Sequence, residues 1–285
     1  MKAGVSSYSF GPYFGRLSKP ELAAKAAEIG FEAIEFAGLG IGGDKQRLMD
    51  EAAEWKEVCA SAGLEISAYC IGADFLNPRG GSLAGEIKAL SDELDIAEAL
   101  GVSKMRHDIT GGAGDLSLMN FFRVLPVLTE GIREVTAYGK SLGIKTMFEN
   151  HGFFMQNSER CRALIEEVAS DNFGALIDIG NFICADDNNA VAVKRMLPYV
   201  FHVHAKDFYV KPFYEDGSYE GWFSSCNGTH ICGAVLGEGD IPVRAIFDLI
   251  KASGYNGTVS LEYEGLEDHI EGITRGCRNL KKLLG

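Results

Sequence analysis

The stretch ELAAKAAEIGFEAIEFA, residues 21–37, contains one complete helix-to-strand junction. Apolar residues recur at helical spacing up to Gly30, and Phe31 then begins a short apolar run with the character of a strand. Glycine tolerates the left-handed conformation that commonly ends a helix. Ser18 and Glu21 have the spacing of a capping box, which predicts where this helix begins. The stretch therefore predicts one helix followed directly by one strand.

The same junction recurs along the chain and predicts a repeated strand–helix unit. The first four glycines of this kind are 33, 38 and 42 residues apart, about the length of one strand plus one helix. The glycines after Gly30 are Gly63, Gly101, Gly143 and Gly254. Filling the gaps gives eight predicted strands, at residues 5–10, 32–37, 65–71, 103–109, 145–150, 174–180, 200–207 and 258–264. Pro126 predicts a kink or a split in the fourth of the helices that lie between them.

Strict alternation of strands and helices is typical of a parallel sheet. Eight units predict a (β/α)8 TIM barrel; a doubly wound open sheet is the alternative, but no GxGxxG motif follows the first predicted strand. No Gly-, Ser- or Pro-rich linker divides the chain, so residues 1–285 are interpreted as a single domain. Residues 208–239 are too long for an ordinary βα loop and are rich in aromatic residues and glycine. We expect them to form a lid-like loop after strand 7 that covers the site.

Composition and charge exclude several classes of protein. The chain has 27 Lys and Arg against 40 Asp and Glu, a net charge of −13, which disfavours nucleic acid as a partner. No stretch approaches the ~20 apolar residues of a membrane span, and the N-terminus does not resemble a signal peptide. Seven cysteines without a CxxC pair indicate a reduced, cytoplasmic protein. A homo-oligomer remains open, because barrels of this kind often pair.

Polar side chains crowd the predicted carboxyl ends of strands 5 to 8, where barrel active sites gather. Alternation of side chains predicts that four of them form one ring inside the barrel: Glu149, Asp178, His204 and Glu262. Each carboxylate taken alone could instead cap the next helix. Three carboxylates together repel one another, so the ring predicts one divalent metal ion, and this ligand set suits Mn²⁺, Mg²⁺, Co²⁺ or Zn²⁺. A lysine or arginine filling that position would argue against the ion.

Other polar residues of these strands are predicted to surround the ring. His151, Lys206 and Glu264 should lie one layer nearer the mouth, and His202 one layer deeper, as a hydrogen-bonded histidine that supports a ligand. His151 is a candidate base or a partner for a substrate hydroxyl. Lys206 either faces a substrate oxygen or pairs with Asp207 in solvent. Glu264 is expected to partner a nearby cation or amide.

Further candidates for substrate binding come from other parts of the chain. His107, in MRHDIT, is expected to reach the mouth of the barrel. Trp222 and Phe223 are predicted to give an apolar cover for a sugar face or an aglycone. Glu35 and Tyr8 are candidates for the floor of the pocket, although aromatic side chains there more often pack than bind.

Five motifs in sequence carry a family resemblance. FENHG, LIDIGN, FHVHAKD, LGEGDIP and VSLEYEG resemble the sugar phosphate isomerase/epimerase group of the xylose isomerase-like TIM barrels. In the ketose 3-epimerases of this superfamily one metal is held by Glu, Asp, His and Glu from strands 5 to 8. The resemblance places these roles on Glu149, Asp178, His204 and Glu262. Relatives often have a substrate-binding histidine where this chain has Asn181, so their substrate preference does not transfer.

The resemblance implies a divalent-metal-dependent sugar isomerase or epimerase with a small-molecule sugar as its partner. A metal beside two carboxylates suits abstraction of a proton next to a carbonyl and stabilisation of the resulting enediolate. Glu149 and Glu262 are the predicted pair of proton-transfer groups. The alternative is a metal-dependent lyase that cleaves 3-oxo sugars or C-glycosides after the same proton abstraction, with His151 as the base.

Two functions from other classes fit the sequence less well. A DNA abasic-site endonuclease shares the barrel but needs more metal ligands and a basic face, whereas this chain has six histidines and a net charge of −13. A catalytically silent sugar-binding barrel is the other alternative, and the complete predicted ligand set argues against it.

Overall fold

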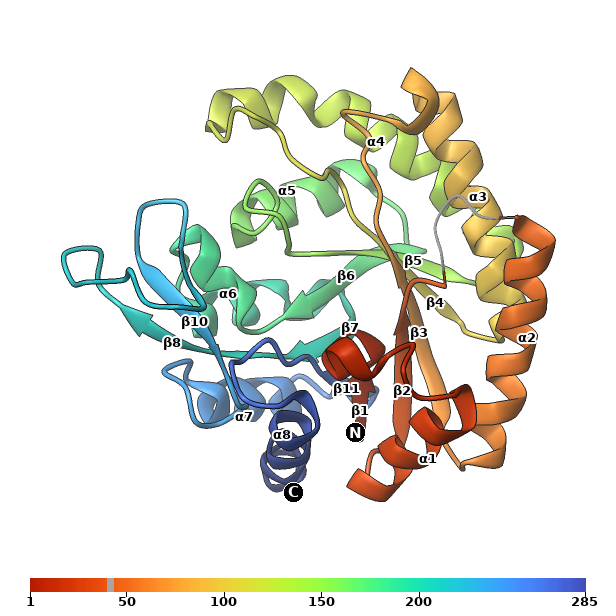
Figure 1. Cartoon of the computed structure of the whole chain (residues 1–285). Coiled ribbons are helices and arrows are strands. Elements are labelled where there is room, and N and C mark those ends of the chain that lie inside the picture. The colour runs from red at the N-terminus through yellow and green to blue at the C-terminus, as the bar shows by residue number, and fades with distance from the viewer. Residues whose placement is uncertain (40–43) are drawn as a thin grey trace.

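The computed structural model describes residues 1–39 and 44–285 and shows a closed barrel of parallel strands (Figure 1). Each barrel strand pairs with the barrel strands that come before and after it along the chain. The last barrel strand pairs with the first and closes the barrel. This confirms the predicted eight-stranded parallel barrel. The strands are β1 (Lys2–Ser6), β2 (Ala33–Ala37), β3 (Glu65–Ile71), β4 (Lys104–His107), β5 (Lys145–Glu149), β6 (Phe173–Asp178), β7 (Val200–Ala205) and β11 (Thr258–Leu261).

Helices connect the strands and surround the barrel (Figure 1). Helix α1 begins at the predicted capping box, where the Ser18 backbone N–H donates to the Glu21 carboxylate at 2.9 Å. It ends at Gly30, whose φ of 107° lies in the left-handed region. The main helices are α1 (Lys19–Ile29), α2 (Lys45–Ser61), α3 (Leu83–Leu100), α4 (Leu118–Ser141), α5 (Ser158–Val168), α6 (Asn189–Met196), α7 (Val243–Ala252) and α8 (His269–Leu284). Among the described residues, no helix is both long enough and apolar enough to cross a membrane.

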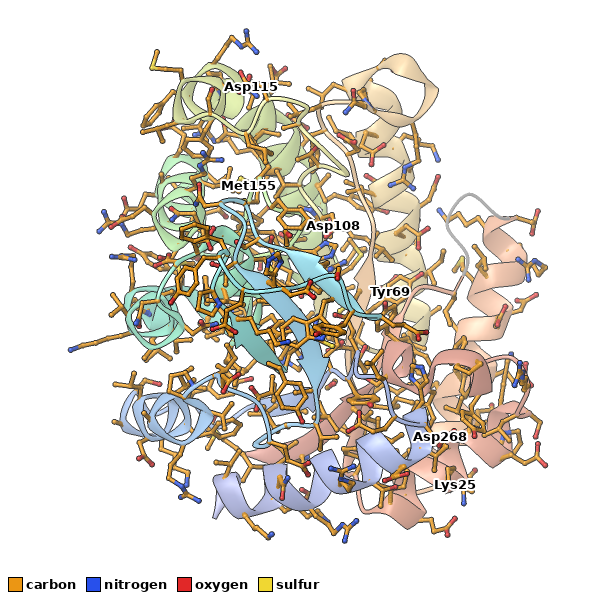
Figure 2. All side chains as sticks on the ribbon, turned by 60° about the vertical axis from the view of Figure 1, so that its left-hand side comes forward. Lys25, Tyr69, Asp108, Asp115, Met155 and Asp268 are labelled. Carbon is orange, nitrogen blue, oxygen red and sulfur yellow. The ribbon has the colours of Figure 1, made fainter. Side chains whose placement is uncertain are left out.

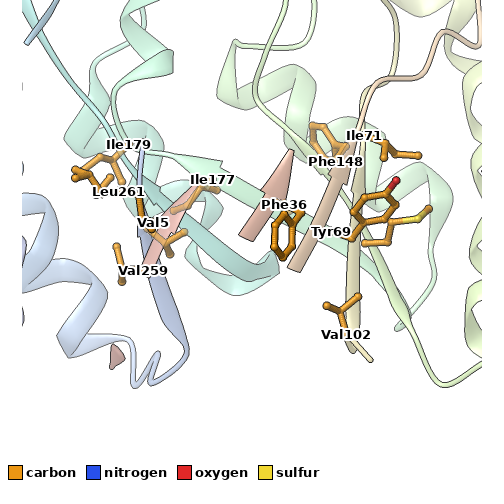
Figure 3. Close-up of a cluster of buried hydrophobic side chains, with 14 of the residues drawn as sticks. Val5, Phe36, Tyr69, Ile71, Val102, Phe148, Ile177, Ile179, Val259 and Leu261 are labelled. Carbon is orange, nitrogen blue, oxygen red and sulfur yellow. The ribbon is translucent and has the colours of Figure 1, made fainter. Parts of the chain in front are cut away.

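Apolar side chains on the outward face of the strands form most of the core. Successive side chains of a strand point to opposite faces, so every second residue packs against the helices. Figure 3 shows part of this layer, including Phe36, Tyr69, Phe148 and Ile177, each at most 1% exposed. A smaller apolar cluster is formed by the alternate residues Ala68, Cys70, Met147 and Leu176, which point into the barrel. The remaining inward positions nearer the mouth are largely polar.

In the N-terminal half, the structure corrects the first strand and one of the two alternatives expected at Pro126. The first strand is Lys2–Ser6 rather than 5–10, and Ser7–Tyr13 forms a 3-10 helix. Pairing with β11 starts at Lys2, and the Ser9 hydroxyl then accepts the backbone N–H of Tyr263 at 2.9 Å, which holds the turn against the end of β11. Of the kink or split expected at Pro126, the split is absent, because helix α4 runs from Leu118 to Ser141 without interruption. Its buried apolar face, which includes Phe121, Leu128 and Ile132, continues across the proline.

The segment after β7 is not one long loop but a three-stranded antiparallel sheet, which faces the viewer in Figure 2. Its strands are β8 (Asp207–Lys211), β9 (Trp222–Ser224) and β10 (His230–Ala234). Gly233 contacts the chain beside β11 so closely that a Cβ atom there would lie 2.1 Å from the Glu264 carbonyl oxygen. The small sheet is therefore packed against the rim of the barrel.

Asp207 holds this sheet to the barrel. Its side chain is 1% exposed, and its two carboxylate oxygens accept four backbone N–H groups. The donors are Phe208 at 2.9 Å, Gly237 at 2.8 Å, Gly239 at 3.1 Å and Ile241 at 3.2 Å. Asp207 is thus turned away from Lys206 and makes no pair with it in solvent.

Replacing Asp207 by asparagine is expected to lower the free energy of unfolding by about 2–4 kcal/mol. The amide keeps the shape of the side chain but places an N–H₂ group against two of the four backbone donors. Denaturant unfolding measures the change, and Asp248→Asn on the exposed side of α7 serves as the matched control. An Asp207→Asn variant as stable as the control would contradict this role.

Candidate metal centre and active site

The structure brings the four predicted ligands together. One potential ligand atom from each of Glu149, Asp178, His204 and Glu262 lies within 4.8 Å of the other three. Glu149 and Asp178 end β5 and β6, His204 lies in β7 directly beside Asp178, and Glu262 follows β11. The carboxyl ends of all these strands meet at one edge of the barrel, which explains why residues 113 positions apart converge.

Three of the converging atoms have no hydrogen-bond partner among the described residues. They are Asp178 Oδ2, His204 Nδ1 and Glu262 Oε2, and all three are buried. His204 Nδ1 lies 3.3 Å from Glu262 Oε2 and 3.6 Å from Glu149 Oε1. Leaving such atoms without a partner is unfavourable. Burial raises the pKa of Asp178 to about 7; the charge of Lys206 opposes this shift, and the charges of Glu262 and Glu149 add to it. The donor set therefore fits a divalent cation.

Glu35 fixes the orientation of the histidine in this cluster. Its two carboxylate oxygens lie 2.6 Å from Nε2 of His204 and 2.8 Å from Nε2 of His202, which also lies 3.0 Å from the Ser260 hydroxyl. A hydrogen bond from Nε2–H leaves Nδ1 of His204 facing the carboxylates. Despite burial, the charges of Glu35, Glu262 and Glu149 raise the pKa of His204, so a bound ion would take the place of a proton on Nδ1.

Two cationic side chains flank the cluster on opposite sides. The Arg106 guanidinium binds Glu149 Oε2, with its Nε at 2.9 Å, and also contacts Asp108. Lys206 Nζ lies 2.8 Å from Glu262 Oε2, without hydrogen-bond alignment, and 3.1 Å from Glu264 Oε2. It lies 3.5 Å from Asp178 Oδ2, whereas its ion pairs with the described residues do not include Glu149. Lys206 therefore pairs with two of the three carboxylates of the cluster, and Arg106 pairs with the third.

Two asparagines tie these groups together. Asn181 donates from Nδ2 to Glu149 Oε1 at 3.2 Å and accepts a hydrogen bond from Lys206 at 3.4 Å. Asn150 forms a reciprocal pair with the backbone of Asp178, at 2.8 and 2.9 Å, and so joins the ends of β5 and β6. Asn181 is 3% exposed. Its amide therefore links Glu149 to Lys206 within the cluster.

A cavity of about 290 Å³ opens above this cluster. His151 lines it, with a half-exposed ring whose Nδ1 lies 3.5 Å from Asp108 Oδ1. The hydrogen bond to Asp108 and the nearby Glu149 raise the pKa of His151 against the effect of burial. Lys206 and Glu264 reach the same cavity. The structure thus places the three residues predicted nearer the mouth around one space.

The structure places two other candidates away from this cavity. His107 does not reach the mouth: it is fully buried between the rings of Phe75 and Phe173, and burial lowers its pKa to about 4. Alternation along β4 turns its side chain outward to the helices. The ammonium of Lys211 instead lies over the Trp222 ring, 4.5 Å from the ring centroid. Its neighbour Phe223 lines a cavity of about 120 Å³ beside Lys206 and His151.

Arg106 and Asp108 line the cavity above the four proposed ligands, and sequence reasoning missed both. The alternation of charged and apolar residues along β4 could have indicated both. Lys104, Arg106 and Asp108 alternate with the apolar Met105, so period-2 spacing puts the charged residues on the face opposite His107. Choosing the inward face by charge rather than by the presence of a histidine would have found them.

Comparisons with known proteins agree with this fold. Residues 23–283 match the family model described as xylose isomerase-like TIM barrel, and the chain belongs to this family. It is 25% identical over 197 residues to the inosose dehydratase of Clostridium perfringens strain 13. That alignment covers 62% of this chain and 63% of that protein. It is 23% identical over 288 aligned positions to the L-ribulose 3-epimerase of Mesorhizobium japonicum, covering 98% of this chain and 88% of that protein.

A solved structure shares the whole fold. The probable 3-DHS dehydratase from Bacillus anthracis superposes with a TM-score of 0.77 over 99% of each chain, at 18% sequence identity. The proteins that this chain resembles are thus named as an epimerase and as dehydratases. These names describe those proteins.

Proposed function

We propose that this protein is a divalent-metal-dependent isomerase or epimerase of a sugar that carries a carbonyl group. One observation carries the proposal: four potential ligands converge below a cavity, and three of their buried atoms have no hydrogen-bond partner among the described residues. Glu149, Asp178, His204 and Glu262 would hold the ion. When bound, such an ion polarises a carbonyl and stabilises negative charge on its oxygen.

The two glutamates are suited to move a proton to and from carbon. The charges of Lys206 and His204 lower the pKa of Glu262 in spite of burial, and Arg106 and His204 do the same for Glu149. Both carboxylates are therefore ionised at neutral pH. Arg106 occupies Oε2 of Glu149, whereas the Glu262 side chain is 12% exposed. We assign removal of the proton to Glu262. Glu149 then takes up a proton from water and delivers it to the opposite face, while Glu262 releases the substrate's proton to solvent.

The surrounding charges favour a sugar without a phosphate group. Arg106 is paired with Glu149 and Asp108, and Lys206 lies close to Glu262, Glu264 and Asp178. Among the described residues lining the cavity, these are the two cations that are permanently charged. A phosphate would have to break ion pairs that the carboxylates already make.

A lyase that begins with the same proton abstraction is the second candidate. The half-exposed His151, held by Asp108, could act as its base, and a relative is named inosose dehydratase. The two candidates differ in the step after proton removal. An epimerase returns the proton, whereas a lyase expels a group from the neighbouring carbon.

The test is proton exchange in D₂O with metal-stripped and metal-loaded protein. The protein is loaded with Mn²⁺, Mg²⁺, Co²⁺ or Zn²⁺ and offered ketoses and 3-oxo-glycosides while NMR follows deuterium at the carbon next to the carbonyl. We expect exchange with formation of an epimer or isomer, and a loss of about 100-fold or more on chelation that metal restores. Release of an aglycone or of water instead would identify the lyase. Protein that binds none of these ions and exchanges no substrate would contradict the proposal.

A further inference from the structure

A second cavity adjoins the cavity above the four proposed metal ligands, here called the catalytic cavity. The second cavity is the larger of the two, about 490 Å³. Tyr8, Ala37 and Glu264 line both, so the two spaces meet along these residues. The second cavity, here called the outer cavity, is otherwise lined by Ser7, Gly11, Phe14, Tyr263, Gly265 and His269. A ligand whose sugar ring lies above the metal ligands therefore has space to extend past Tyr8.

The walls of the outer cavity are mainly aromatic and apolar. Tyr8 is 53% exposed and Phe14 is 37% exposed, although both are large apolar side chains beside an active site. The Phe14 ring is supported from behind by Trp55, with centroids 6.2 Å apart and planes 17° apart. Tyr263 is 1% exposed and supports this surface from within, with its hydroxyl donating a hydrogen bond to Glu267. Rigid aromatic walls of this kind suit stacking against another ring.

The outer cavity offers little attraction to a charged group. Among its described lining residues, Glu264 is the one permanently charged side chain, and Lys206 lies 3.1 Å from its carboxylate. The His269 ring is held by the Ser9 carbonyl oxygen at 3.0 Å from Nδ1. An uncharged, flat substituent is the group this space would hold best.

We propose that the substrate is an aryl glycoside oxidised at a ring carbon, with its sugar in the catalytic cavity and its aromatic aglycone in the outer cavity. This inference rests on the proposed function and narrows its substrate. A substituent on the anomeric carbon removes the carbonyl that a free sugar has there. The carbonyl next to which Glu262 removes a proton must then be a ketone elsewhere in the ring.

The apolar contact with an aglycone that was predicted for residues 222 and 223 is now assigned to the outer cavity. Trp222 and Phe223 were expected to contact an aglycone, but Trp222 is occupied by Lys211. The cavity that Phe223 lines is about 120 Å³, roughly a quarter of the outer cavity. Tyr8 lies in the 3-10 helix after β1, and Phe14 directly follows that helix. Both line the larger of these two cavities.

The first experiment compares 4-nitrophenyl 3-oxo-β-glucoside with 3-oxo-glucose in the D₂O exchange assay. We expect kcat/KM to be about tenfold higher for the aryl glycoside, as stacking of one further ring would give. Phe14→Ala should reduce this ratio to near one, and the milder Phe14→Leu should give an intermediate value. Phe122→Ala, an exposed phenylalanine on α4, is the matched control and should keep the wild-type ratio. Equal kcat/KM values for the two substrates in the wild-type protein would overturn the inference while leaving the proposed function intact.

The second experiment does not depend on catalysis. Isothermal titration with unoxidised 4-nitrophenyl β-glucoside and methyl β-glucoside compares binding of the wild-type protein to inert probes. We expect about tenfold tighter binding of the aryl glucoside, lost in Phe14→Ala. Tighter aryl binding without exchange of any oxo-sugar would support the outer cavity and count against the proposed function. Equal binding of the two inert probes would overturn the assignment of the outer cavity.

Discussion

Replacing Glu262 by glutamine should lower the rate of proton exchange by about 10²–10⁴-fold, the usual contribution of a positioned proton-transfer group. The amide keeps an oxygen that can remain a metal ligand but cannot accept a proton from carbon. Glu149→Gln should behave differently. Because Glu262 still removes the proton and is the more exposed carboxylate, this variant should exchange the substrate's own hydrogen but form little product.

Metal content has to be measured beside both rates, because both side chains are proposed ligands. A variant that retains the ion and loses exchange separates proton transfer from metal binding. Glu271→Gln, on the exposed side of α8, is the control for removing one carboxylate charge. Wild-type rates of exchange and product formation in both Glu262→Gln and Glu149→Gln would contradict the assigned roles.

Replacing Glu35 by glutamine should weaken metal binding by about 10–100-fold, although Glu35 is not one of the four proposed ligands. The carboxylate holds Nε2–H of both His202 and His204, and an amide can present an acceptor to only one of them. The ring of His204 then loses the partner that aims Nδ1 at the cluster. Titration of stripped protein with Mn²⁺ or Zn²⁺ measures the change in affinity.

Glu93→Gln is the matched control for this effect. Glu93 is also a buried glutamate, 3% exposed, and accepts a hydrogen bond from the Tyr69 hydroxyl at 2.7 Å, but it lies on α3 outside the barrel. Its replacement should affect stability without changing metal affinity. If Glu35→Gln binds metal as tightly as the wild-type protein, Glu35 does not position His204 as we infer.

Comparison of β4 and β7 shows how far alternation alone could predict the site. The polar residues His202 and His204 of β7 and Lys206 just after it occupy one face, and the structure points all three into the barrel. In β4 both faces carry a candidate, because His107 and Arg106 are neighbours. Only the contacts show that Arg106 binds Glu149 and that His107 packs between two phenylalanine rings.

The sequence by itself determined the strand–helix rhythm and the residues that gather at the strand ends. Glycine at a helix end and alternation along a strand are local effects, and parallel strands bring their carboxyl ends to one edge in any register. Only the tertiary structure decided what lies beside those residues. The contact of the Glu35 carboxylate with His204 depends on closure of β1 onto β11 and on the register of that pair. The outer cavity lined by Tyr8 depends on the same closure. Such contacts join residues more than 160 positions apart, and no local pattern encodes the distance between them.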